Sequence, residues 1–159
     1  MWLVLLSLGC KNDDAIIPTE GSWLIDQDSV AFSSDGCGLQ TGLVFYDLII
    51  DQLDADGFRF IDTNGDAFTC SLGAADFSCA DLVLERDASA RAALTFTSAL
   101  SGTFSSETAL ERTLSISGVC EGSDCAELFS SVSFPCETTA SMEAVYDGPA
   151  DEIDSGFDG

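Results

Sequence analysis

Apolar and polar residues alternate along most of the chain between Gly21 and Tyr146. The clearest alternating runs are LTFT at 94–97, TLSIS at 113–117 and SVSFPCE at 131–137. Alternation turns the apolar side chains to one face of a β-strand, and no segment sustains the apolar stripe of an amphipathic helix. Glycine, aspartate and serine separate the runs. The pattern predicts an all-β fold of about 8–10 antiparallel strands, arranged as a β-barrel or a β-sandwich.

The run GLVFYDLII at 42–50 is apolar at almost every position instead of alternating. A strand that is covered on both faces has such a composition. This segment is therefore predicted to form a central strand of the sheet.

The NG dipeptide at 64–65 predicts a hairpin turn within FRFIDTNGDAF. A two-residue loop would put Phe58 and Phe60 on the opposite face of the sheet from Phe68 and Cys70. A three-residue loop that ends in a left-handed glycine instead pairs Phe60 with Phe68 and Phe58 with Cys70. The second register is predicted, because it gathers the apolar side chains on one face.

A second hairpin is predicted in FTCSLGAADFSC, with its turn centred on residues 74–75. This turn sets Leu72 opposite Phe77 and Cys70 opposite Cys79. Two directly opposed cysteines in a non-hydrogen-bonded pair lie near the Cα separation that a disulfide needs. The register therefore predicts a Cys70–Cys79 disulfide.

The apolar positions change parity after Cys79, because the next apolar residues are Leu82 and Leu84. One extra residue in the strand, a β-bulge near 80–81, accounts for the change. Without a bulge, Asp81 would be a buried carboxylate with a raised pKa. With the bulge, Asp81 turns out to solvent, which is the interpretation we prefer.

Seven cysteines and no histidine occur in the chain. If Cys10 is set apart, the other six make three disulfides. Cys120 and Cys125 are predicted to pair across the short EGSD turn, and Cys37–Cys136 then follows by elimination. The absence of histidine and of a second matching cysteine pair disfavours a zinc site. The cysteines therefore indicate an oxidising compartment.

The net negative charge of the chain limits which molecules it can bind. The 159 residues include 28 acidic and five basic ones, which gives a formal net charge of -23. Such a chain repels phosphate backbones, so we expect no nucleic-acid partner and a mainly solvated acidic surface. The lack of histidine also excludes Ser-His-Asp and Cys-His catalysis. A pair of carboxylates is the familiar catalytic device that remains.

The segment DTNGDA places Asp62, Asn64 and Asp66 at the first, third and fifth ligand positions of a Ca²⁺ loop. The sixth position of such a loop is glycine and the twelfth is a bidentate glutamate, but this chain has Ala67 and Gly73 there. A plain turn accounts for the same residues, so no metal or cofactor is expected. A Ca²⁺-dependent binding module stays open as an alternative.

Residues 2–9, WLVLLSLG, form an apolar run that is followed directly by Cys10. The run is too short for a membrane span, which needs about 20 residues, and has the character of a signal-peptide core. The stretch resembles the lipobox of bacterial lipoproteins, in which the signal peptide is removed before a cysteine that carries lipid. The resemblance implies a signal peptide over 1–9 and a lipid-anchored tether over 10–20. Lys11, where aspartate would mark inner-membrane retention in enteric lipoproteins, implies the outer membrane.

The tripeptide GSW at 21–23 is similar to the G-x-W start of lipocalins. In that family the tryptophan closes one end of a β-barrel against a late arginine. The last basic residue of this chain is Arg112, well before the final strand. The resemblance implies a barrel with Trp23 at one end, and an ordinary core position for Trp23 is the alternative that we prefer.

Taken together, the sequence predicts a β domain over residues 21–146 and an acidic, disordered tail over 147–159. We expect a lipid-anchored cell-envelope protein that touches the membrane through its N-terminal lipid. Its β domain is expected to serve binding or structure without catalysis, and a carboxylate-pair hydrolase is the alternative. A cavity with two converging acids would favour the enzyme, and a filled core would favour a structural module.

Overall fold

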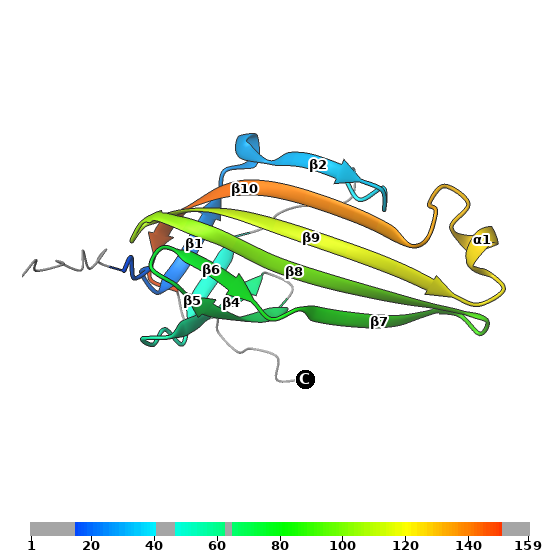
Figure 1. Ribbon diagram of the computed structural model, residues 1–159, viewed down its shortest axis with the longest axis horizontal. Coiled ribbons are helices and arrows are strands. Elements are labelled where there is room, and N and C mark those ends of the chain that lie inside the picture. Colours follow the sequence, from blue (N-terminus) through cyan, green and yellow to red (C-terminus); the bar gives the residue numbers. More distant parts are fainter. Residues whose placement is uncertain (1–14, 41–46, 63–64, 151–159) are drawn as a thin grey trace, which may run out of the picture.

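The computed structural model describes residues 15–40, 47–62 and 65–150 (Figure 1). These residues form ten strands and two short helices, which confirms the predicted all-β class. In chain order the elements are β1 (Gly21–Ile25), η1 (Gln27–Ser29), β2 (Ala31–Asp35), β3 (Leu48–Asp51), β4 (Gly57–Asp62), β5 (Ala67–Leu72), β6 (Asp76–Cys79), β7 (Leu82–Ser89), β8 (Ala92–Ser106), β9 (Ala109–Glu121), α1 (Cys125–Leu128) and β10 (Cys136–Gly148).

Eight of these strands close into an antiparallel barrel in the order β1-β3-β4-β5-β6-β8-β9-β10, and β10 pairs back with β1. The other two strands continue members of the ring. β2 follows β1 and also pairs with β10, and β7 follows β6 and also pairs with β8. Because the first and last strands of the sheet pair with each other, the fold is a barrel and not a sandwich.

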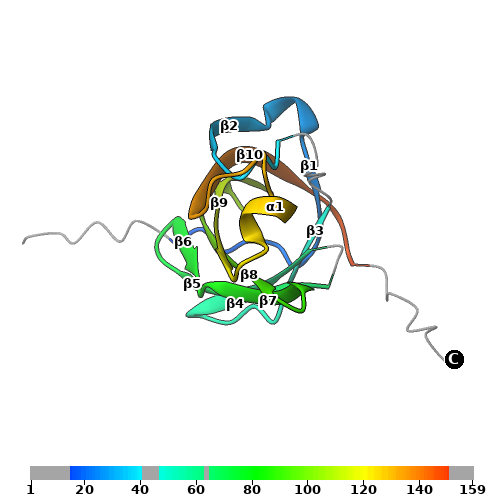
Figure 2. The same ribbon diagram turned by 90° about the vertical axis from the view of Figure 1, so that its right-hand side faces the viewer.

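The strands of the ring differ in length. β8 has 15 residues and β9 and β10 have 13 each, whereas β1 and β3 to β6 have between four and six. The long strands run the length of the molecule, and the short ones complete the ring near one end (Figures 1 and 2). We call the part ringed by β1 and β3 to β6 the closed half. We call the part where β7, β8, β9, β10 and β2 continue toward α1 the extended half.

Aromatic rings fill the closed half. The ring of Phe104 lies 6.0, 5.7 and 5.1 Å, between centroids, from Trp23, Phe58 and Phe77. Phe60 packs against Phe58 and Phe77 at 5.0 and 5.4 Å. All five side chains are at most 3% exposed. An eight-stranded barrel has an interior that side chains just fill, so these five rings form a packed core.

The first predicted hairpin is confirmed. In the β4–β5 pair, Phe60 lies opposite Phe68 and Phe58 lies opposite Cys70. Gly65, the last residue of the loop, has a φ of +81°, in the left-handed region that favours glycine. The need to keep the phenylalanines on one face therefore does fix the register of this hairpin.

The second hairpin and the three disulfides also match the predictions. Leu72 lies opposite Phe77, and Cys70 lies opposite Cys79. Among the described residues the disulfides are Cys70–Cys79, Cys120–Cys125 and Cys37–Cys136. The last of these links residues 99 positions apart, and closing so long a loop contributes about 4–5 kcal/mol in the chain-entropy account.

The predicted bulge lies between β6 and β7. Ser78 pairs with Ser101, and Leu82 pairs with Ser98. Four steps along one strand thus face three steps along β8, which is the one-residue insertion of a β-bulge. The side chain of Asp81 is exposed, as the bulge predicts.

One predicted strand is wrong in its bounds, and another lies partly outside the described residues. The run at 131–137 does not form a strand throughout, because β10 begins only at Cys136. Pro135 has no N–H to donate to a ladder, and before it the rings of Phe129 and Phe134 pack together at 5.6 Å. The predicted central strand at 42–50 is β3 in its described part, and residues 42–46 lie outside the described residues.

Residues before β1 lie against the closed half. Ile16 donates a backbone hydrogen bond to the carbonyl of Ala74, and Thr19 donates one to that of Glu107. Pro18 is fully buried, and the indole Nε1 of Trp23 donates to the carbonyl of Thr19 at 3.0 Å. Of the segment predicted as a tether, residues 15–20 therefore belong to the folded domain. At the other end of the domain, β10 continues to residue 148.

The packing predicts different costs for removing two phenylalanines of β8. Phe104→Ala is expected to lower the free energy of unfolding by about 3–5 kcal/mol, because it empties the centre of the aromatic core. Phe96→Ala, at a half-buried inward position of the same strand, is expected to cost less than half as much. Urea denaturation of both variants measures the two values, and equal losses would contradict the distinction between the halves.

Candidate functional site

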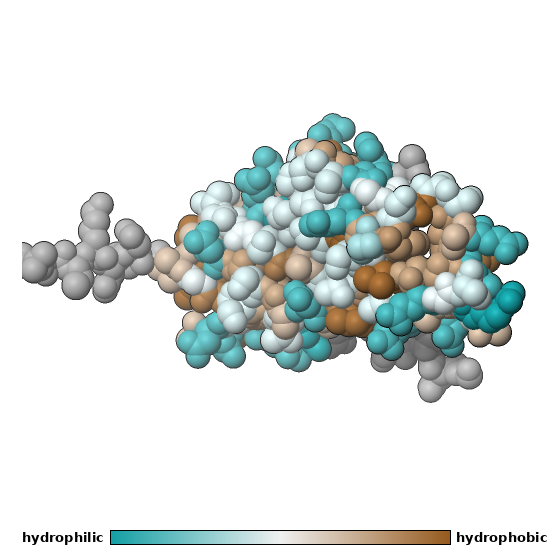
Figure 3. Space-filling view, turned by 45° about the vertical axis from the view of Figure 1, so that its right-hand side comes forward, coloured by the Kyte–Doolittle hydropathy of each residue, from teal (hydrophilic) through white to brown (hydrophobic). Residues whose placement is uncertain are grey.

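The inner face of the extended half carries apolar side chains that are only half buried. On β8, Leu100 is 2% exposed, whereas Leu94 and Phe96 on the same face are half buried. Apolar side chains gather around a hollow at this end of the molecule (Figure 3). The inner apolar face consists of Leu82, Leu84, Leu94, Phe96, Leu114 and Ile116.

The register explains how these side chains come together. Leu84 pairs with Phe96 across β7 and β8, and Phe96 pairs with Gly118 across β8 and β9. A Cβ atom at position 118 would approach the Phe96 ring and the Cys136 Sγ to 2.8 Å. Gly118 therefore lets the Phe96 ring approach β9 closely. The described strands that form the sheet here are β7, β8, β9, β10 and β2.

Arg112 lies on β9 at the base of the inner apolar face. It alternates with Leu110 and Leu114, so its side chain is directed into the barrel. The residue is 6% exposed. Its Nε atom is buried and has no hydrogen-bond partner within the described part of the chain. A guanidinium with a donor left unsatisfied thus lies between the buried Leu110 and the half-buried Leu114.

Burial lowers the pKa of Arg112 to about 10, and the negative charge of Asp62 acts in the opposite direction. A pKa of about 10 still leaves the guanidinium protonated at neutral pH. The two ion pairs among the described residues join Arg59 to Asp51 and Arg91 to Asp124, near the surface. Arg112 is in neither pair, and Asp62 supplies the negative charge that acts on it.

The DTNGDA segment forms a turn. The backbone N–H of Asp66 donates to the Asp62 carboxylate at 3.0 Å, and the N–H of Gly65 donates to the Asp62 carbonyl at 3.0 Å. These hydrogen bonds support the turn interpretation. Asn64 lies outside the described residues, and within those residues no three metal-ligating side chains converge.

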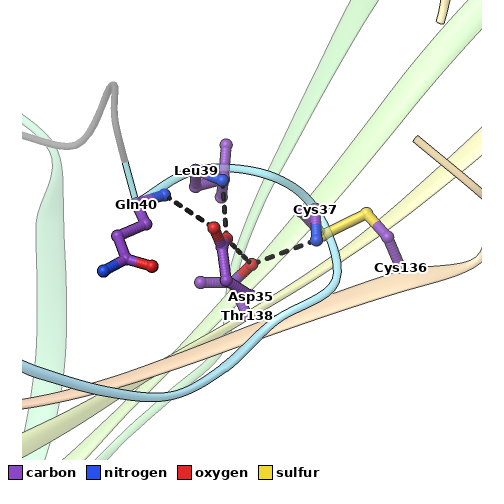
Figure 4. Close-up of a disulfide and its surroundings, with 6 residues drawn as sticks. All are labelled: Asp35, Cys37, Leu39, Gln40, Cys136 and Thr138. Carbon is purple, nitrogen blue, oxygen red and sulfur yellow. Dashed lines mark hydrogen bonds between the residues drawn. A yellow bond between two sulfur atoms is a disulfide. The ribbon is translucent and has the colours of Figure 1, made fainter. Parts of the chain in front are cut away.

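A disulfide and a carboxylate fix the loop that follows β2 (Figure 4). The carboxylate of Asp35 accepts from the backbone N–H of Leu39 at 2.6 Å and of Gln40 at 3.1 Å. It also accepts from the hydroxyl of Thr138 at 3.0 Å, and that hydroxyl accepts from the N–H of Cys37 at 3.2 Å. Because Thr138 is 1% exposed, this short network joins the loop to the inner side of β10.

The same contacts shift the pKa of Asp35. Desolvation raises it, but the hydrogen bonds from Gln40, Leu39, Thr138 and Gly38 together lower it below its ordinary value. A carboxylate with a lowered pKa stabilises the fold at pH values above its unfolded pKa. That stability is lost as the pH falls through the folded pKa.

One surface depression borders the inner apolar face. It has a volume of about 390 Å³ and lies at the tip of the β7–β8 hairpin, where its charged lining residues are Glu85, Arg86, Asp87 and Glu121. Most of this lining belongs to the outer face of the sheet, so the depression lies beside the hollow and is not part of it.

The other residues singled out in the sequence have separate places. Trp23 is fully buried in the closed half, against Phe104 and Tyr146 at 6.0 Å each. Arg112 comes from β9 and not from the last strand. Cys10 lies outside the described residues. Within the described residues, no helix is long and apolar enough to cross a bilayer.

No protein-family model, curated protein or solved structure matches this chain. The function has to be inferred from the site itself.

The importance of Arg112 was missed in the sequence, although a signal was present. In the stretch ALERTLSISG, Leu110, Arg112, Leu114 and Ile116 fall on alternate positions. An arginine at an inward position of an alternating strand is a candidate for a buried charge. Its burial depends on the closure of the barrel, which the sequence alone does not show.

The Asp35 network predicts an acid-sensitive contribution to stability. Asp35→Asn is expected to lower the unfolding midpoint at pH 7, and the difference from the parent should shrink as the pH falls below about 4. Thermal unfolding followed by circular dichroism between pH 7 and pH 3 measures this. Asp81→Asn, which alters an exposed carboxylate, is the control. A difference from the parent that does not change with pH would contradict the assignment.

Proposed function

We propose that this protein is a lipid-anchored cell-envelope protein whose barrel binds an apolar ligand without catalysis. The observation that carries the binding role is the half-buried inner apolar face in the extended half. Monomeric domains rarely leave contiguous apolar surface uncovered unless something binds there. Ligand sites commonly lie in the mouths of β-barrels.

The acids of the described chain favour binding over hydrolysis. A carboxylate-pair hydrolase needs two acids that face one cavity. Asp35 and Asp62 instead accept backbone hydrogen bonds within their own turns. Glu85, Asp87 and Glu121 line one surface depression, but their register puts them on the outer face of the sheet and not on the inner apolar face. We therefore propose a carrier or binding module rather than an enzyme.

The lipid anchor rests on the N-terminal sequence. The apolar run at 2–9, the Gly9-Cys10 junction and the odd cysteine count all support it. The three disulfides use the other six cysteines, which leaves Cys10 for lipid. An oxidising compartment suits these disulfides, so a cell-envelope location, at the outer membrane, is part of the proposal.

Filling the hollow is expected to abolish binding of a neutral apolar probe. Ser98 lies on the inner face of β8 between Leu82 and Ile116. Ser98→Trp should weaken the binding of N-phenyl-1-naphthylamine by roughly tenfold or more, since the indole occupies the same space. Ser117→Trp, at an outward position of β9, is the matched control and should bind as the parent does. Fluorescence titration measures the affinities, and a parent protein that does not bind the probe would refute the binding role.

Removing the cysteine is expected to release the protein from the membrane. Cys10→Ser cannot carry the lipid, and a protein without acyl chains has no stable hold on a bilayer. Fractionation of cells expressing each form should place the parent with the membranes and the variant in the soluble fraction. Mass spectrometry of the parent N-terminus that finds no acyl groups would disprove the anchor.

A further inference from the structure

We propose that the extended half binds a single-chain amphiphile with a carboxylate head, whose head group contacts the Arg112 guanidinium while its chain lies along the inner apolar face. This inference rests on the proposed binding role and gives it a ligand class. It follows from the position of one cation at the base of an apolar hollow.

Burial along β9 places Arg112 at the boundary. Leu110, two residues toward the closed half, is 3% exposed and belongs to the filled core. Leu114 and Ile116, two and four residues toward the extended half, are half buried. The side chain of Arg112 is directed to the same interior as theirs. An anion would therefore reach Arg112 at the inner end of this face, next to the buried Leu100 and Ala140, which lie opposite Leu114.

The Nε atom of the guanidinium lacks a hydrogen-bond partner, although the charge of Asp62 acts favourably on the cation. Its Nε is buried with no hydrogen-bond partner in the described chain, and neither of the two ion pairs found there includes it. A buried charge without hydrogen bonds is costly. The planar fork of an arginine matches the two oxygens of a carboxylate. A ligand carboxylate would supply the hydrogen-bond acceptor that Nε lacks among the described residues.

The rest of the hollow fits a chain and not a second charged group. Residues 114 to 120 of β9 span roughly 20 Å at the rise of a β-strand, which is the length scale of an acyl chain. The side chains along this path are those of the inner apolar face. The net charge of -23 repels ligands that carry several negative charges. A ligand with a long apolar chain and one small anionic head buries the most apolar surface and is repelled least by the acidic protein.

Dodecanoate and methyl dodecanoate, each below its critical micelle concentration, test the head group. Both should displace N-phenyl-1-naphthylamine from the parent protein, and dodecanoate should bind roughly ten- to a hundredfold more tightly, as expected for a charge-assisted hydrogen bond. Arg112→Met should bind both with similar affinity and still bind the neutral probe. Arg91→Met removes a charge that is paired at the surface and should keep the preference.

The outcomes separate the two proposals. If the parent binds the neutral probe but does not prefer dodecanoate, or if Arg112→Met keeps the preference, the carboxylate site is wrong and the binding role stands. If the parent binds neither the probe nor the two lipids, both proposals are wrong. The Arg112→Lys variant retains the charge without the fork, and it should prefer dodecanoate more weakly than the parent does.

A measurement on the parent protein tests the contact even if Arg112→Met fails to fold. In a pH titration of bound, carboxyl-labelled dodecanoate by ¹³C NMR, contact with a guanidinium should lower the pKa of the ligand carboxyl below its value in water. Burial away from Arg112 would raise that pKa. A raised value would overturn the proposal.

Discussion

The aromatic packing inside the closed half is the interaction on which the rest of the structure depends. Phe104 touches rings from three other strands, β1, β4 and β6, through Trp23, Phe58 and Phe77. These contacts join strands from different sides of the barrel wall. They allow β1 to meet β10 and remove the exposed edges that an open sheet would present. The five rings also use up the interior space of an eight-stranded barrel at this end.

The uneven strand lengths then determine where a ligand can be held. Because β8, β9 and β10 continue beyond the short strands, their inner faces extend past the filled core. The Cys37–Cys136 disulfide and the Asp35 network hold the loop after β2 against β10 in this region. Arg112 lies where the aromatic core ends. The unequal strand lengths therefore account for both the packed closed half and the uncovered apolar surface of the extended half.

Local features could be predicted from the sequence, because each depends on a few neighbouring residues. The parity of Phe58, Phe60 and Phe68 determined one hairpin, and the change of parity after Cys79 located the bulge. The choice between barrel and sandwich could not be made, because β1 and β10 pair across more than 100 residues. The start of β10 was placed too early, because alternation was followed through Pro135. The hollow was missed, because burial of inward residues depends on which strands lie opposite them.

The central claim is that one half of the barrel is filled and the other has apolar space. Crystals of the mature domain under xenon pressure test it most directly, because xenon enters apolar cavities and is excluded from packed cores. The account predicts xenon density bounded by Leu94, Phe96 and Ile116, and none among Phe58, Phe77 and Phe104. Xenon density within the aromatic cluster, or none at the inner apolar face, would contradict it.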